Sequence, residues 1–214
     1  MIIMPVISGG VSKPAVSSYK FSSSTTTNAT TYTFTSLTLN GSGTRVIALG
    51  VTAEGGSSAW VVSSITFGGS GMTIVQNQAD NTGGVSETVT LAYIETALST
   101  ATIVVTYTGA RQNCTLRGMQ IDYYKTAAPV TSAIRDVGSP GTLACAGGSP
   151  TAGVLIAGAR ITSATYPTFS NGPTLTNGRV ENSNTSSGVN FDATSTALTS
   201  SSPDRGRAIV ATWK

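Results

Sequence analysis

Short apolar runs separated by turn-forming residues constrain this sequence more than any other feature. Each run has the β-branched and aromatic composition of a strand, and glycine-rich groups such as NGSG, EGGSS, GGSG and DNTGG lie between them. The runs lie at 31–39, 44–53, 60–67, 72–78, 85–95, 101–107 and 115–125. None has the 3.6-residue period of a helix over a useful length. This spacing predicts an all-β chain folded as an antiparallel β-sandwich or a jelly-roll-like structure.

The chain length leaves the number of folding units open. A chain of 214 residues can bury its core as one large domain or as two small lobes. The apolar run AGVLIAGA is followed by TSATYPTF much as RVIALGV is followed by SSAWVVSSITF, which indicates a pseudo-repeat. RVIALGV (45–51) is apolar at nearly every position, as in a central strand covered on both faces. The Ser-, Thr-, Asn- and Gly-rich stretch 167–203 predicts long loops with weak strands, before RAIVATW forms a last strand.

The run 85–95 shows the clearest alternation of side chains. One face carries Val85, Val89, Leu91 and Tyr93, and the other carries Ser86, Thr88, Thr90 and Ala92. We predict that the first face packs in the core and that the second contacts water.

The composition predicts a neutral surface rich in hydroxyl groups. The chain has 28 Ser, 35 Thr and 24 Gly, whereas only 10% of its residues are charged and its net charge is +3. The basic residues are scattered singly, so the chain lacks the basic patch of a nucleic-acid-binding surface. No stretch has the length and apolarity of a membrane span, and the N-terminus lacks the positive region of a secretory signal. We therefore expect no nucleic-acid partner and no membrane partner.

The N-terminus is the one feature that suggests a docking element. We divide the chain into an apolar arm (1–21), a Ser/Thr-rich linker (22–30) and a β-sandwich body (31–214). An exposed apolar cluster usually marks a surface that binds something. The candidate docking residues are Ile2, Ile3, Met4, Val6 and Ile7. Two interpretations stay open: the arm docks on a partner, or it folds back as an edge strand of its own domain.

The residues most used in catalysis are scarce. The chain has no histidine and two cysteines, which excludes Ser-His-Asp and Cys-His catalytic groups and the usual zinc sites. Glu87 and Glu95 share a strand face but lie roughly 26 Å apart, too far for a glycosidase pair. We therefore predict no enzymatic activity, no metal and no cofactor.

Four further side chains and one loop carry structural expectations. Cys114 and Cys145 are expected to be unbonded thiols, because the context is not that of a secreted disulfide scaffold. Trp60 and Trp213 are expected in the core rather than as platforms for sugar stacking. QADNTGG (78–84) is interpreted as a turn, since it lacks enough carboxylates for a calcium site.

Three consecutive stretches, SSITFGGSGMTIV, VTLAYIE and STATIVVTYTG, resemble a β-sandwich module of tailed-bacteriophage structural proteins and some bacterial surface proteins. The resemblance extends over residues 31–214 and carries no functional residues to transfer. It implies a virion protein made in the host cytoplasm, and we expect a decoration (cement) protein on the capsid surface. Its partner would be the major capsid protein, and the role suggests a homotrimer. The alternatives are a tail or fibre component that binds a host glycan and a bacterial adhesin module.

Overall fold

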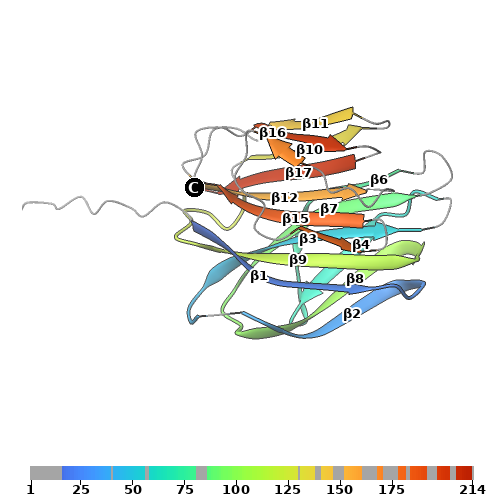
Figure 1. The fold of residues 1–214 in the computed structure, drawn as a ribbon. Coiled ribbons are helices and arrows are strands. Elements are labelled where there is room, and N and C mark those ends of the chain that lie inside the picture. The colour runs from blue at the N-terminus through green and yellow to red at the C-terminus, as the bar shows by residue number, and fades with distance from the viewer. Residues whose placement is uncertain are drawn as a thin grey trace, which may run out of the picture.

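The computed structural model describes twelve segments of the chain. They are residues 16–39, 41–55, 58–80, 86–129, 131–137, 141–146, 152–160, 168–170, 178–181, 184–191, 197–202 and 206–213. Within these segments the regular secondary structure is entirely strand, and all pairings are antiparallel (Figure 1). The predicted all-β sandwich is therefore confirmed.

The first nine strands form one lobe, which we call lobe 1 (16–122). They are β1 (Val16–Thr25), β2 (Ala29–Thr38), β3 (Arg45–Glu54), β4 (Val62–Phe67), β5 (Ser70–Gly71), β6 (Thr73–Asp80), β7 (Glu87–Thr96), β8 (Thr100–Arg111) and β9 (Asn113–Asp122). Its inner sheet has the order β1-β9-β3-β7-β6, and its outer sheet has the order β2-β8-β4-β5. Strands pair from the outside inward, β1 with β9, β2 with β8 and β3 with β7. This nested pairing across two sheets is the topology of a jelly roll.

The innermost hairpin of lobe 1 joins β4 to β5. Thr66 pairs with Gly71 and Phe67 with Ser70, so Gly68 and Gly69 form a two-residue loop. Their φ angles are 58° and 85°. A type I′ hairpin turn needs positive φ at both central residues, which glycine adopts without a steric penalty. The GGSG motif therefore fixes this register.

The remaining eight strands form lobe 2 (131–213). They are β10 (Thr131–Val137), β11 (Gly141–Ala146), β12 (Ala152–Arg160), β13 (Thr168–Ser170), β14 (Gly178–Glu181), β15 (Asn184–Phe191), β16 (Ala197–Ser202) and β17 (Gly206–Trp213). Four of these lie in the stretch expected to be mainly loops. The inner sheet has the order β10-β17-β12-β15-β14, and the outer sheet has the order β11-β16-β13.

Lobe 2 repeats the topology of lobe 1. The order β10-β17-β12-β15-β14 matches β1-β9-β3-β7-β6 strand for strand, and β11-β16-β13 matches β2-β8-β4. The runs RVIALGV and AGVLIAGA fall on the equivalent strands β3 and β12. The pseudo-repeat is thus a repeat of the whole jelly roll, and of the two arrangements left open by chain length, the structure has two lobes.

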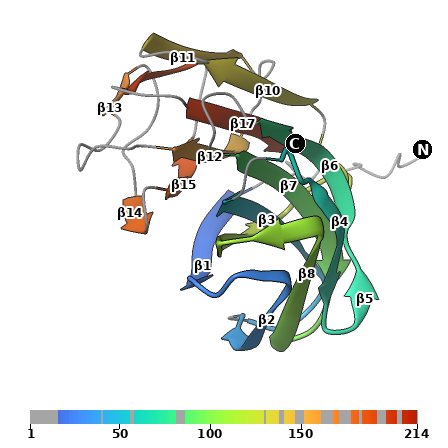
Figure 2. The same cartoon turned by 90° about the vertical axis from the view of Figure 1, so that its right-hand side faces the viewer.

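The two lobes pack through their inner sheets, as Figure 2 shows with lobe 2 stacked on lobe 1. Strand β15 contacts β3 and β9, and reciprocally β7 contacts β12 and β17. Reciprocal contacts of equivalent elements are the mark of an approximate two-fold relation. The chain therefore contains a face-to-face dimer of jelly rolls within one polypeptide.

Two hydrophobic clusters follow from this stacking. The core of lobe 1 lies between its own two sheets and includes Ile47, Leu49, Phe67 and Ile103, all fully buried. The second cluster lies between the lobes, and we call it the seam. The seam contains Val46, Ala48, Val89, Leu91, Met119, Ile121, Ile209, Ala211 and Trp213. Strand β3 contributes to both clusters, so the prediction that it is covered on both faces is confirmed.

The predicted wet face of the run 85–95 is wrong. Thr88 and Thr90 are buried, because β7 lies in the inner sheet, which packs against a layer on each side. Their hydroxyl groups bond inside lobe 1: Thr88 donates to the carbonyl of Trp60 at 2.6 Å, and Thr90 to Asn77 Oδ1 at 2.9 Å. Threonine can therefore occupy a buried strand face when hydrogen-bond acceptors lie within reach of its hydroxyl group.

The expected boundaries of arm and linker also need correction. Strand β1 runs from Val16 to Thr25 and pairs along its length with β9, so residues 16–25 belong to the inner sheet of lobe 1. The packing of Phe21 explains why this segment belongs to the sheet. Its ring lies over Gly118 of β9, where an added Cβ would collide with it, and it is 7% exposed in the lobe 1 core. For residues 16–21 the interpretation of the arm as an edge strand therefore applies, and the Ser/Thr-rich residues 22–25 continue the same strand.

We expect Phe21→Ala to destabilise the protein by about 3–5 kcal/mol, because it removes a buried aromatic ring and leaves a cavity at β1. Lys20→Ala, at the neighbouring bulge residue, is the matched control and should change stability by less than about 0.5 kcal/mol. Urea unfolding of both variants measures the difference. An effect of Phe21→Ala no larger than that of the control would show that β1 does not belong to the core.

Candidate functional site

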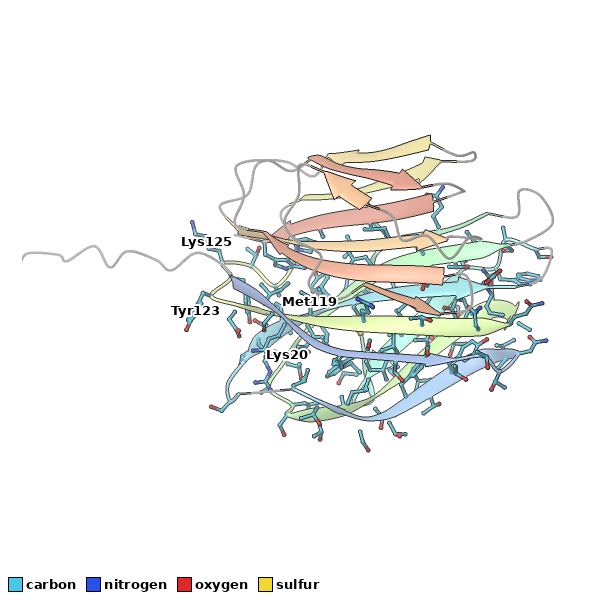
Figure 3. The ribbon with its side chains drawn as sticks, in the orientation of Figure 1. Lys20, Met119, Tyr123 and Lys125 are labelled. Atoms are coloured by element: carbon cyan, nitrogen blue, oxygen red, sulfur yellow. The ribbon has the colours of Figure 1, made fainter. Side chains whose placement is uncertain are left out.

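The end of lobe 1 at which β1 begins is the first candidate for a binding surface, and we call it the entry pole. Val16, the first residue of β1, pairs with Asp122, the last residue of β9. Residues 123–125 follow directly, and Figure 3 shows Tyr123 and Lys125 at this end of the molecule, with Lys20 on the adjacent strand. The N-terminal residues therefore join the fold beside Tyr123.

Tyr123 has two unusual properties at this pole. Its backbone φ is 59°, in the left-handed region that non-glycine residues seldom adopt. Its side chain is 56% exposed, the highest value among the large hydrophobic residues that the structure describes. A strained backbone that holds an exposed aromatic ring is a feature from which a binding function can be proposed.

Tyr124, by contrast, is anchored. Its hydroxyl donates a hydrogen bond to Glu95 Oε1, and its ring packs against the seam. Burial, the hydrogen bond to Glu95 and the charge of that carboxylate raise the pKa of Tyr124 to about 12. The phenol therefore stays neutral at physiological pH and acts as a tether between the segment after β9 and strand β7.

A shallow groove of about 410 Å³ lies between the edge strands β1 and β2 and is lined by residues 23–25, 27, 29 and 31–35. Most of these are serine or threonine. Tyr32 lies in its floor, only 3% exposed, and donates its hydroxyl hydrogen to the carbonyl of Arg111. Burial raises the pKa of Tyr32 to about 12. The groove offers neutral hydrogen-bonding groups and no acid or base that titrates near neutral pH.

The opposite end of lobe 1 is closed by a buried arginine. Arg111, fully buried at the end of β8, donates to the carbonyls of Ala53 (3.0 Å) and Gly55 (3.1 Å). It also donates to Ser86, at 2.7 Å to Oγ and 3.0 Å to the carbonyl. These bonds join the ends of β3, β7 and β8 across the two sheets of lobe 1. We interpret Arg111 as a structural clamp, because its planar fork suits several carbonyl acceptors at once.

Trp60 departs from the expectation of core burial. It is 39% exposed and lies over Gly109 of β8, where any Cβ would collide with the indole. Trp60 lies in the connection that follows β3, before β4 begins at Val62, rather than on a strand. Trp213 is fully buried in the seam, as predicted.

Cys114 is a free, fully buried thiol, which agrees with the expectation that it is not bonded to Cys145. It lies 3.4 Å from the hydroxyl of Tyr107, and burial raises the pKa of the Cys114 thiol to about 12. A thiol with so high a pKa is not a nucleophile at neutral pH. The side chain of Cys145 lies outside the described residues.

The described part of the chain offers no candidate metal centre. Within those segments no group of three or more His, Cys, Asp or Glu side chains could hold a metal ion. The same segments contain no helix long and apolar enough to cross a membrane. Glu95 is exposed, whereas the side chain of Glu87 and most of the loop 78–84 lie outside the described residues.

The predicted docking residues Ile2, Ile3, Met4, Val6 and Ile7 lie outside the described residues. The structure locates only the point at which their segment joins the fold, at the entry pole. The exposure of Tyr123 depends on a backbone angle that no local sequence motif indicates. No sequence pattern indicates the role of Arg111, because a single arginine at the end of a strand is usually exposed to solvent.

Comparison of the chain with models of protein families, with curated proteins and with solved structures found no match.

We expect Cys114 to resist thiol reagents in the native protein even at pH 9, because the thiol is buried and its pKa lies near 12. The measurement uses a Cys145→Ser variant, so that only Cys114 reports. Reaction with a chromogenic disulfide should be absent in buffer and complete in concentrated guanidinium chloride. Thr27→Cys, at an exposed position in the same background, should react at once. Rapid native labelling of Cys114 would contradict the burial described here.

Proposed function

We propose that this chain is a non-enzymatic virion structural protein, a capsid decoration protein that binds the outer surface of a bacteriophage capsid and stabilises it. One observation supports this more than any other. An apolar segment containing Ile2, Ile3, Met4, Val6 and Ile7 leads, within a few residues, into the edge strand of a rigid body. Such a chain can anchor through its terminus while its body covers the partner.

The energetics of such an anchor are favourable. Burial of each Ile, Val or Met side chain contributes roughly 1.5–3 kcal/mol. Five such residues can outweigh the cost of ordering the segment and reach about micromolar affinity, which corresponds to roughly 8 kcal/mol. A homotrimer at a three-fold position of the capsid would present three arms at once and multiply this affinity. The partner in this proposal is the major capsid protein.

The body has the properties that this role needs. Among the described residues no group of acidic or thiol side chains could hold a metal ion, Cys114 is buried, and the two jelly rolls are joined through an apolar seam. A rigid protein with neutral hydroxyl groups suits the reinforcement of a shell, because contacts made by neutral groups depend less on pH and salt than contacts between charges do.

The decisive experiment removes the segment before β1 and leaves β1 intact. Deletion of residues 1–15 should leave the unfolding free energy within about 1 kcal/mol of the full chain, because it keeps β1 whole and chain termini usually contribute little. The same deletion should abolish co-sedimentation with undecorated capsids of the phage that carries this chain.

Two substitution variants sharpen this test. Serine at positions 2, 3, 4, 6 and 7 should act like the deletion, whereas Ser8→Ala with Ser12→Ala, a polar control in the same segment, should bind like the full chain. Undiminished capsid binding by the truncated protein would refute the docking role of these residues.

A second candidate function is supported by Trp60. Its indole is 39% exposed and lies against Gly109, while Thr88 holds the main-chain carbonyl of Trp60, so the ring could stack against a sugar. A tail or fibre component, or an adhesin module, would use such a surface to bind a host glycan.

For the capsid role we expect no binding to glycans of the host envelope in a glycan array. Binding that is lost in Trp60→Ala but retained in Leu98→Ala, a control at a comparably exposed apolar residue, would favour the glycan role instead. Thermal unfolding of both variants distinguishes a lost contact from a lost fold.

A further inference from the structure

The two lateral sides of the lobe 1 sandwich are built differently. On one side β6 of the inner sheet lies beside β4 of the outer sheet, and Asn77 bridges them. Its Nδ2 donates to the carbonyl of Val62 at 2.7 Å, and its Oδ1 accepts from the N–H of Val62 at 3.3 Å. A side-chain amide carries the same donor and acceptor as a peptide group. Asn77 therefore pairs with the edge of β4 as a residue of a further strand would.

The opposite side of the sandwich has a groove instead of a bridge. Strands β1 and β2 are the edges of the inner and outer sheets there, and Figures 1 and 2 show them as neighbours at the bottom of lobe 1. In the part of the chain that the structure describes, β1 is hydrogen-bonded to β9 alone and β2 to β8 alone. The groove of about 410 Å³ lies between these two edges.

The direction of the backbone groups on β2 follows from the pairing of β8. Along an antiparallel strand, successive residues direct their N–H and C=O groups to alternate sides. The carbonyl of Thr102 accepts from the N–H of Gly68, in the β4–β5 turn, at 2.9 Å. The next residue, Ile103, therefore faces β2, where it pairs with Phe34. Thr33 precedes Phe34 and directs its own N–H and C=O away from β8, towards the free edge.

The same alternation places the backbone groups of Thr31 at the free edge, because the pairing of residues 31–34 with β8 is regular. Outside this stretch the edges are irregular. Register shifts interrupt β2 on both sides of residues 31–34, and another interrupts β1 between Tyr19 and Phe21. Such irregularities protect an edge strand against pairing with another chain. The unprotected part of the β2 edge thus coincides with the part that lines the groove.

The lining of the groove limits what can occupy it. Its walls are serine, threonine and alanine, and the rings of Tyr32 and Phe34 form its floor. A charged group brought into the groove would lose water without meeting an opposite charge. The regular N–H and C=O groups of Thr31 and Thr33 match the backbone of an extended peptide, which carries donors and acceptors at the same spacing.

We propose that this groove binds an extended, uncharged peptide strand of another protein, which adds to the free edge of β2. The backbone of Thr31 and Thr33 supplies the main-chain hydrogen bonds. The hydroxyl groups of residues 23–25 on β1 contact the side chains that point into the groove. In strand addition of this kind, main-chain bonds provide affinity and alternate side chains provide specificity. This binding site is independent of the proposed capsid role of the N-terminal segment.

Amide hydrogen exchange in the full-length protein tests the site. The probe is a capped octapeptide of alternating threonine and valine. At a peptide concentration about ten times its Kd, exchange at Thr31 and Thr33 should slow about tenfold. Exchange at Tyr32 and Phe34 should not change, because these amides already face β8. A control peptide with N-methyl groups on alternate residues lacks the required donors and should leave all four amides unchanged.

Two substitutions at one position separate backbone pairing from side-chain recognition. Thr33→Pro removes the N–H at the free edge, where proline is tolerated, and should weaken binding of the octapeptide about tenfold. Thr33→Val removes the hydroxyl but keeps the N–H, and should bind within about twofold of the unmodified protein. Thermal unfolding checks that both variants fold, and the N-methylated peptide decides the question if the proline variant does not.

Three results would overturn the proposal. The first is unchanged exchange at Thr31 and Thr33 at the highest soluble concentration of the octapeptide. The second is equal slowing by the N-methylated peptide, which would show that side chains rather than the backbone are recognised. The third is slowing without any peptide that increases with protein concentration, which would show that a second copy of the chain occupies the groove.

Discussion

Burial of both faces of the inner sheet of lobe 1 is the constraint on which the rest of the structure depends. Strands β3 and β9 are buried along nearly their whole length, with one face against the outer sheet and the other against lobe 2. Lobe 1 alone would expose Val46, Leu91, Met119 and Ile121 to water, at roughly 25 cal/mol for each Å² of apolar surface. Lobe 1 therefore needs lobe 2 to cover this apolar face. Because the two lobes are related by an approximate two-fold axis, each covers the inner sheet of the other with its own inner sheet.

Because the inner sheet of lobe 1 is covered on both faces, its polar side chains need hydrogen-bond partners within the protein. Ser86 receives a bond from Arg111, and Thr88 and Thr90 donate to neighbours inside lobe 1. These bonds satisfy hydroxyl groups that would otherwise be costly to bury. The same bonds connect β7 with the β3–β4 connection, β6 and the end of β8, so they also add to the cohesion between the two sheets of lobe 1.

The sequence predicted the elements well and their environment less well. Strand-like runs and glycine turns located β2 to β4 and β6 to β9 within a few residues, because both signals are local, whereas the two-residue strand β5 lies within the predicted turn GGSG. The burial of Thr88 and Thr90 was not predicted, since an alternating pattern describes one covered face and contains no information on a second layer. For β1 the sequence left an edge strand as one of two interpretations, because its Ser- and Thr-rich composition also suits a linker, and the pairing with β9 and the packing of Phe21 against Gly118 place it in the sheet. The exposure of Tyr123 and Trp60 depends on how connections leave the sandwich, which no residue pattern specifies.

Nested pairing has a consequence for how this chain can fold as it is synthesised. The first strand of lobe 1 pairs with the last, so Val16 finds its partner only after Asp122, 106 residues later, has left the ribosome. Closing such a long loop is entropically expensive and slow, and β proteins with distant pairings fold over milliseconds to seconds. The hairpins β4–β5, β6–β7 and β14–β15 join strands that are neighbours in the sequence, so they are local enough to form early. The inner sheet of lobe 1 must then wait for β17, the final strand, before its second face is covered.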